Sequence, residues 1–153
     1  MSARDHGPGV RLPLPLLVGG VVLGGWMMRQ ILPVQISAPL PGLSAAVMGL
    51  GLALSIWTVV TMLRAGTDPR PDKPDQALVE RGPFRFSRNP IYLGFLLVAT
   101  GFALRWGDLW PWLSVAWCFL LLDRMVVARE EAYLRRRFGA AYEAYMQRVR
   151  RWV

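Results

Sequence analysis

Gly82-Pro-Phe-Arg-Phe-Ser-Arg-Asn-Pro-Ile-Tyr-Leu-Gly94 joins a polar loop to an apolar segment, and this stretch decides the fold. Asn89 followed by Pro90 is typical of a helix start, because asparagine caps a helix and proline fits its first turn. We therefore expect a helix to begin here, with its free N–H groups and positive dipole end beside Arg85 and Arg88. Such a place attracts a carboxylate.

The apolar residues around this stretch indicate a membrane protein. They make up 54% of the 153 residues and form runs too long for an ordinary soluble core. Residues 12–30 carry one charge and residues 43–63 carry none. At about 1.5 Å per residue, helices of these lengths cross a hydrocarbon core of about 30 Å. Residues 91–104 and 110–122 are shorter and are flanked by tryptophan and arginine. The sequence predicts an all-α integral membrane protein with about four transmembrane helices.

The basic residues give its orientation. Lys and Arg number two in residues 1–12, six in 64–90 and eight in 123–153, against one near each of the other two connections. By the positive-inside rule, both termini and the central loop are expected in the cytoplasm. The basic residues that give the net charge of +8 are distributed by membrane side rather than gathered in one patch. No nucleic-acid partner is therefore expected. We predict a single domain over 1–153 in the lipid bilayer, with 1–11 as a disordered lead-in.

Two residue counts limit the chemistry. The chain has one cysteine, Cys118, inside an apolar run, and one histidine, His6, near the N-terminus. Neither a disulfide framework nor a cysteine or histidine metal site is therefore expected.

A second polar cluster follows the fourth apolar run. Its residues recur at helical spacing and share one face: Asp123, Val127, Glu130, Glu131 and Leu134. Because the third and fourth runs are joined by only a few residues, their helices must be antiparallel neighbours. This geometry brings Arg88 and Asn89 towards the carboxylates of the second cluster. Two polar clusters are thus predicted to converge on one site.

Beyond this cluster the pattern predicts an amphipathic helix on the cytoplasmic face. Arg135–Arg137 form a basic run that can face lipid phosphates. The apolar and aromatic residues of this helix form a stripe that is interrupted at Gly139. The members of the stripe are Leu134, Phe138, Tyr142, Tyr145 and Val149.

Each cluster also has a structural interpretation. Arg85 and Arg88 fit the positive-inside rule by themselves, and Glu131 could pair with Arg135 four residues on. Asp123, beside an arginine within an apolar stretch, reads as half of an internal ion pair. The tyrosines of the stripe could be interfacial anchors. The pairing of Arg88 with carboxylates opposite favours a site.

Both clusters belong to one combined motif, Leu78-Val79, Gly82-Pro-Phe-Arg85, Arg88-Asn-Pro-x-Tyr92-x-Gly94, then Glu130-Glu131, Phe138-Gly139-x-x-Tyr142-x-x-Tyr145 and Val149-x-Arg151-Trp152. It resembles the isoprenylcysteine carboxyl methyltransferase family in its short prokaryotic form, with phospholipid N-methyltransferases as more distant relatives. The resemblance covers about residues 64–153.

The resemblance implies S-adenosylmethionine as methyl donor and S-adenosylhomocysteine as product. Residues 64–153 are then the cofactor-binding catalytic half, facing the cytoplasm of a prokaryotic inner membrane. The acceptor is a lipophilic small molecule or prenylated group that enters from the bilayer. Arg88 and Glu131 are the implied catalytic residues, Arg88 for a carboxylate acceptor and Glu131 for an amine. The implied cofactor-binding residues are Leu78, Val79, Gly82, Arg85, Arg88, Asn89, Tyr92, Glu130, Glu131 and Tyr142.

Asn89 departs from the pattern of relatives that act on prenylated termini, which commonly have histidine there. Asparagine can hydrogen-bond but cannot shuttle a proton near neutral pH, so no acid/base role is expected at this position. A lipid amine acceptor therefore stays an alternative. A non-catalytic membrane scaffold is another, motivated by Arg135–Arg137 and the basic C-terminus. A transporter fits less well, since the first two helices carry no deep charge.

Overall fold

The computed structural model describes residues 13–69 and 77–153, and these are helical apart from short connections. The predicted lead-in, 1–11, lies outside the described residues. The helices are α1 (Leu14–Ile31), α2 (Pro41–Arg64), α3 (Pro90–Trp106), α4 (Leu109–Leu121), α5 (Ala128–Phe138) and α6 (Ala140–Arg148), with a 3₁₀ turn, η1 (Gly82–Arg85), and a π-helical segment, η2 (Leu122–Val127). The all-α prediction is confirmed.

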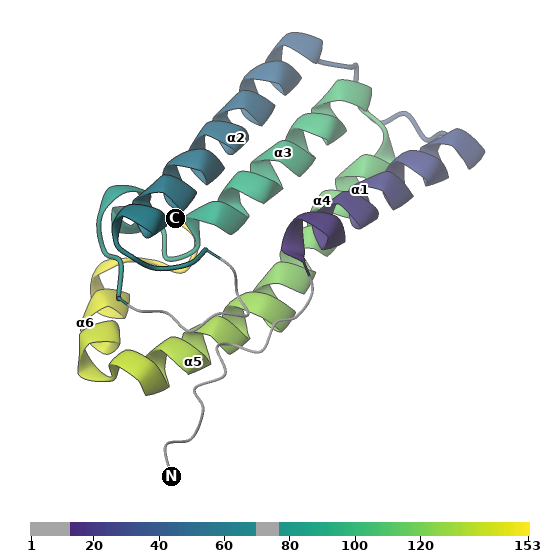
Figure 1. The fold of residues 1–153 in the computed structure, drawn as a ribbon. Helices are drawn as coiled ribbons and strands as arrows, with labels where there is room; N and C mark the ends of the chain where they lie inside the picture. The colour runs from purple at the N-terminus through teal and green to yellow at the C-terminus, as the bar shows by residue number, and fades with distance from the viewer. Residues whose placement is uncertain (1–12, 70–76) are drawn as a thin grey trace.

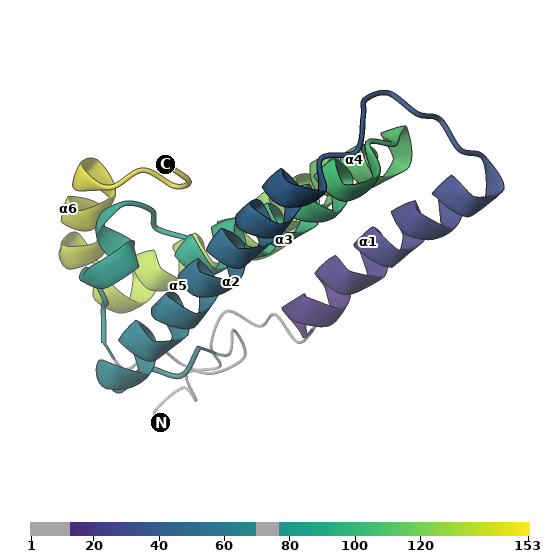
Figure 2. The ribbon, with the colours of Figure 1, turned by 90° about the horizontal axis from the view of Figure 1, so that it is seen from above.

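The helices pack as two pairs. Figure 1 shows α2 beside α3 and α1 beside α4, and the hairpin of α3 and α4 joins the pairs. Seen from above in Figure 2, α1 lies apart from α2. The backbones of α2 and α3 come close together at Gly51 and Gly94: a Cβ atom on Gly51 would lie 2.6 Å from the Gly94 carbonyl oxygen. Absence of a side chain at both positions lets the backbones meet.

Within residues 13–69 and 77–153, three helices are long and apolar enough to cross a membrane: α1, α2 and the continuous helix Leu109–Phe138. The remaining predicted span, residues 91–104, corresponds to α3, a shorter apolar helix of 17 residues that lies between α2 and α4. Large apolar side chains on the outer faces, such as Leu50, Ile56 and Trp117, are exposed. In a soluble protein such a surface would aggregate, whereas lipid solvates it. The protein is an integral membrane protein.

The end of the bundle away from α5 and α6 is fastened by backbone hydrogen bonds. The amides of Ile36 and Ser37 donate to the Gly107 carbonyl, and the Leu109 amide donates to Val34 O. Asp108, which is fully buried, accepts from the amides of Val34 (2.8 Å) and Trp110 (3.2 Å). The α1–α2 connection is thereby tied to the α3–α4 connection, which fixes the two helix pairs relative to each other.

The continuous helix from Leu109 carries the second polar cluster beyond the apolar region, as the sequence predicted. Its hydrogen bonding changes at η2, where a π-helical segment that the sequence did not predict precedes α5. The predicted break at Gly139 is confirmed: this glycine has a φ of 51° and separates α5 from α6. Beyond this turn, α6 bonds to η1 through Tyr145, and the segment after α6 reaches the start of α3, where the Arg88 amide donates to the Arg150 carbonyl. These elements form the site end of the molecule.

Candidate functional site

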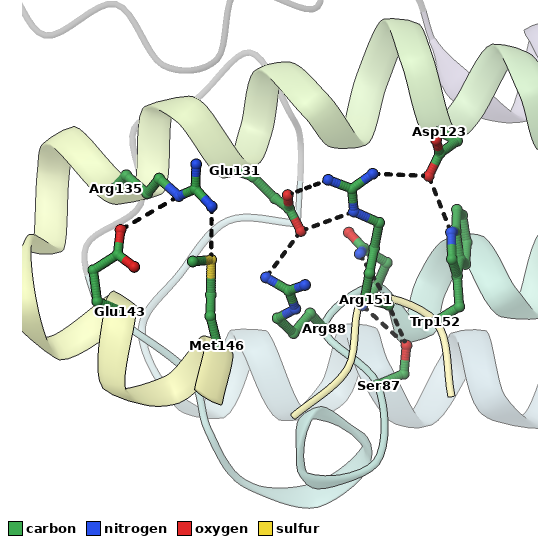
Figure 3. A network of polar contacts seen from close by, with 10 residues as sticks. Ser87, Arg88, Asp123, Glu131, Arg135, Glu143, Met146, Arg151 and Trp152 are labelled. Carbon is green, nitrogen blue, oxygen red and sulfur yellow. Dashed lines mark hydrogen bonds and ion pairs between the residues drawn. The ribbon is translucent and has the colours of Figure 1, made fainter. Parts of the chain in front are cut away.

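The two polar clusters meet where α3 begins and α5 passes beside it. The Arg88 guanidinium lies 3.0 Å from Glu131 Oε1, and the Tyr92 hydroxyl donates to Glu130 Oε1 at 2.5 Å. Figure 3 shows Arg88 and Glu131 pointing toward each other from these two elements. The convergence inferred from antiparallel helices is therefore observed for both carboxylates of the Glu130–Glu131 pair.

Asn89 has a different task from the one predicted. Pro90 does occupy the first turn of α3, but the Asn89 side chain makes no capping bond. Its Nδ2 atom donates instead to the Arg151 carbonyl at 2.9 Å, while its own amide donates to Ser87 Oγ at 3.1 Å. The capping prediction was wrong because the C-terminal segment lies across the helix start and offers the amide group a nearby acceptor.

Glu131 is the most enclosed charge of the site, with 5% of its surface exposed. Besides Arg88, it accepts two bonds from the Arg151 guanidinium, from Nε at 3.2 Å and from the terminal nitrogen at 2.6 Å. Arg135 pairs with Glu143 instead, at 3.4 Å. A solvated turn and a Glu131–Arg135 pair are thus both contradicted as interpretations of Glu131. A carboxylate held by two guanidinium groups suits orientation and charge stabilisation better than proton abstraction.

The tyrosines of α6 point inward rather than to a membrane interface. Tyr142 is 1% exposed, and burial, followed by the negative charge of Glu131, raises its pKa to about 12. Burial also raises the pKa of Tyr145, whose hydroxyl donates to the Phe84 carbonyl at 2.7 Å. Both phenols are therefore neutral at physiological pH and serve as hydrogen-bonding walls.

A cavity of about 100 Å³ opens at this meeting point. Eight of the ten predicted binding residues line it: Leu78, Val79, Arg88, Asn89, Tyr92, Glu130, Glu131 and Tyr142. The other two, Gly82 and Arg85, are not among its lining residues. Arg85 is exposed at the end of η1, and Gly82, with a φ of 60°, makes the turn beside Thr61. For these two, the structure favours a role in the turn.

Further lining residues were not named as candidates by the sequence reasoning. They are Met62, Thr67, Asp68, Pro69, Ala77, Phe84, Pro90, Ile91, Leu134 and Tyr145. Thr67 is buried and exchanges hydrogen bonds with the backbone of Ala77, which fixes these two lining residues against each other. A single threonine in a proline-rich loop carries no signal of this contact. The sequence did carry a signal for Arg151, because this residue belongs to the combined motif.

One donor in the site lacks a partner. Arg88 Nε is buried and forms no hydrogen bond within the described residues. An unpaired buried donor costs about 1–3 kcal/mol unless a ligand or water satisfies it. The same part of the chain contains no group of three or more histidine, cysteine, aspartate or glutamate side chains placed to hold a metal ion. The site is therefore equipped for a ligand that brings an acceptor group to Arg88.

Comparisons with known proteins agree with this geometry. The family described as phospholipid methyltransferase matches residues 41–141, which is more than half of the chain. A protein of Haemophilus influenzae described as uncharacterized is 40% identical over 63 residues, 41% of this chain and 100% of that relative. No solved structure matches. The resemblance to membrane methyltransferases is thus confirmed, and the chain belongs to the phospholipid methyltransferase family.

Proposed function

We propose that the protein transfers a methyl group from S-adenosylmethionine to a lipophilic acceptor at the cytoplasmic face of a prokaryotic inner membrane. The observation that carries the proposal is the convergence of Arg88, Glu130 and Glu131 on one cavity in a membrane methyltransferase. The basic residues of the loop and of the C-terminal region support a cytoplasmic site, with both termini on that side. Residues 64–153 then form the catalytic half.

The side chains that line the cavity match the groups of this cofactor. Arg88, with its unpaired Nε, suits a carboxylate, and Glu130 suits an amino or ribose hydroxyl group. Leu78 and Val79 offer an apolar surface for an adenine ring. When bound, S-adenosylmethionine supplies an electrophilic methyl group on a sulfonium centre. The protein's part is then to position the acceptor in line and to exclude water.

The size of the cavity sets a condition on binding. Its volume of about 100 Å³ is below the roughly 300–1,000 Å³ typical of small-molecule sites. The cofactor enters only if the lining side chains move apart. We therefore expect binding to be accompanied by a change in the packing of the walls.

A second cavity suits the hydrocarbon part of the acceptor. It lies among α1, α2 and α3, has a volume of about 630 Å³ and is lined almost wholly by apolar side chains, including Trp26, Phe95 and Phe102. α3 contributes Tyr92 to the first cavity and Phe95 to the second. Lipid chains reach such a groove from the bilayer without crossing water.

Two acceptor classes remain, and a different observation favours each. The motif resemblance favours an isoprenylcysteine-type carboxylate, which Arg88 can orient. The family description and the acidic pair Glu130–Glu131 favour a lipid amine, whose positive charge these carboxylates attract. We put the carboxylate first because Glu131 is held by two guanidinium groups and is poorly placed to take a proton from an amine.

Calorimetric titration of the detergent-purified protein with S-adenosylhomocysteine tests the cofactor. We expect one-site binding that Arg88→Ala and Glu131→Ala lose while remaining folded. Arg85→Ala is the matched control, because its side chain is exposed and is not among the lining residues; it should bind like the wild type. Absence of binding by folded wild-type protein would contradict the proposal and favour a membrane scaffold that uses the basic face of Arg135–Arg137.

The acceptor is identified by the fate of a labelled methyl group. Incubation with labelled S-adenosylmethionine and either an S-farnesylated cysteine derivative or vesicles of an amine-headed phospholipid separates the two classes. A methyl ester releases volatile methanol in alkali, whereas an N-methyl group does not. Alkali-stable label in the phospholipid would overturn the carboxylate assignment.

A further inference from the structure

The last residues of the chain form one wall of the charged cluster. After α6 the backbone becomes extended at Val149, and the chain crosses the start of α3. The Arg88 amide donates to the Arg150 carbonyl at 3.0 Å, and Asn89 Nδ2 donates to the Arg151 carbonyl at 2.9 Å. The C-terminal segment is therefore attached to the predicted site arginine and to the residue that follows it.

Arg151 extends its guanidinium group from this segment to two carboxylates of the long helix. It binds both oxygens of Glu131, at 3.2 and 2.6 Å, and its remaining terminal nitrogen lies 3.2 Å from Asp123 Oδ1. Trp152 donates to the same Asp123 oxygen at 3.1 Å. Figure 3 shows Arg151 between Glu131 and Asp123, which are eight residues apart. The Arg151 side chain thus fixes the orientation of both carboxylates, those of Glu131 and Asp123.

The charges of this cluster balance only when Arg151 is present. Arg88 forms an ion pair with Glu131, and Arg124, the other partner of Asp123, has a side chain that is 78% exposed. The side chains of Glu131 and Asp123 are 7% and 16% exposed, against 37% for Arg151. An enclosed carboxylate is stable when its partner is fixed in geometry and fully bonded. Loss of Arg151 leaves two enclosed carboxylates with one enclosed cation.

We propose that Arg151 is a positioning residue: by holding both oxygens of Glu131, it sets the geometry of the Arg88–Glu131 pair that binds the cofactor. Arg151 itself is not among the residues that line the cavity, so its effect on a ligand passes through Glu131. Hydrogen bonds to Glu131 are the main cause of the raised pKa of Arg151, consistent with a permanently charged partner. The inference rests on the proposed function.

Titration of the full-length protein with S-adenosylhomocysteine tests it with three variants. Arg151→Ala is expected to weaken binding of the order of tenfold or more, as loss of a residue that orients a ligand-binding side chain commonly does. Arg151→Lys keeps the charge but loses the two-pronged contact, so it should recover part of the affinity. Arg150→Ala is the matched control: it retains the backbone bond to Arg88 and removes only an exposed side chain.

A rescue experiment separates positioning from simple stabilisation. Methylguanidinium added to Arg151→Ala should restore affinity for S-adenosylhomocysteine, while leaving Arg150→Ala unchanged. If Arg151→Ala does not fold, Arg151→Lys is compared with Arg150→Ala instead. Wild-type affinity for S-adenosylhomocysteine in both variants overturns the inference.

The failure of this inference is distinguishable from that of the proposed function. Wild-type affinity in Arg151→Ala, or an equal loss in Arg150→Ala, overturns the positioning role while the enzyme proposal stands. Absence of binding by folded wild-type protein overturns both.

Discussion

The two ends of the bundle are held together by different kinds of interaction. At the connection end, backbone amides and one buried carboxylate, Asp108, join the two helix pairs. At the site end, ionised side chains dominate: Arg88 and Arg151 surround Glu131. The first arrangement is uncharged apart from Asp108 and is suited to fixing helices in lipid. The second is adjustable and suited to a charged ligand, so scaffold and site can be perturbed separately.

The largest expected effect is on the scaffold, at the contact of α2 with α3. Gly51→Ala places a Cβ atom 2.6 Å from the Gly94 carbonyl oxygen and 2.9 Å from Leu97 Cβ, so the helices must separate. We expect a loss of about 3 kcal/mol in unfolding free energy. Reversible denaturation in mixed micelles measures it.

The control for this substitution lies two residues earlier on the same helix. A Cβ atom at Gly49 meets nothing within 4 Å. Gly49→Ala should therefore be neutral or slightly stabilising, since alanine favours a helix over glycine by up to about 1 kcal/mol. Equal losses at both positions would show that helix contact is not the cause.

Removing the carboxylate of the connection end should have the next largest effect. Asp108→Ala leaves the Val34 and Trp110 amides without their acceptor, and we expect a loss of about 2 kcal/mol. Asp108→Asn retains one acceptor oxygen and should lose less. Thermal unfolding of the two variants provides the measurement. If they were equally stable, the amide contacts would contribute little.

A smaller effect, confined to alkaline pH, is expected at the site end. Because the pKa of Tyr142 is about 12 in the folded protein, against 10.0 for an ordinary tyrosine, folding favours the neutral phenol. Its contribution is complete below pH 10 and is lost as the pH rises from 10 to 12. Tyr142→Phe should reduce this alkaline loss of stability.

The reduction should be partial, because Tyr145 also has a raised pKa and still contributes to the alkaline loss of stability. Unfolding followed by circular dichroism at pH 7 and pH 11 checks this. An identical pH profile for Tyr142→Phe and wild type would contradict it.

The smallest effect is expected for an ion pair on the surface of the site end. Arg135 and Glu143 are about half exposed, so water and salt screen their attraction. Arg135→Ala should change the unfolding free energy by less than about 0.5 kcal/mol. A larger loss that disappears in high salt would show that exposed charges at this end act as a network.

Local signals in the sequence predicted the frame of the site. Pro90 marks a helix start, Gly139 marks a break, and the short connection between two apolar runs requires antiparallel neighbours. These features depend on residues close in sequence, and the structure reproduces all three. The closeness of Arg88 to Glu131 followed from them without knowledge of any contact.

Contacts between distant segments could not be predicted in the same way. The Asn89 side chain can accept from nearby backbone amides or donate to a distant carbonyl, and only the path of the C-terminal segment supplies the distant one. Thr67 meets Ala77 across a loop. Arg151 looked like another basic residue at a membrane surface, although its motif hinted at more. Side-chain type shows what a residue can bind, whereas the fold selects the partner.

The π-helical segment η2 also constrains how the family can vary in length. A π-helix holds more residues in each turn than an α-helix, in which one residue corresponds to a rotation of about 100°. Deleting one residue between Leu122 and Val127 would restore ordinary α-helical bonding and leave the direction of Glu131 nearly unchanged, whereas the same deletion in α4 would rotate Glu131 by about 100°. A relative that lacks one residue at this place can therefore keep the same side chains facing the cavity, whereas a one-residue gap elsewhere in the long helix would turn them away from it.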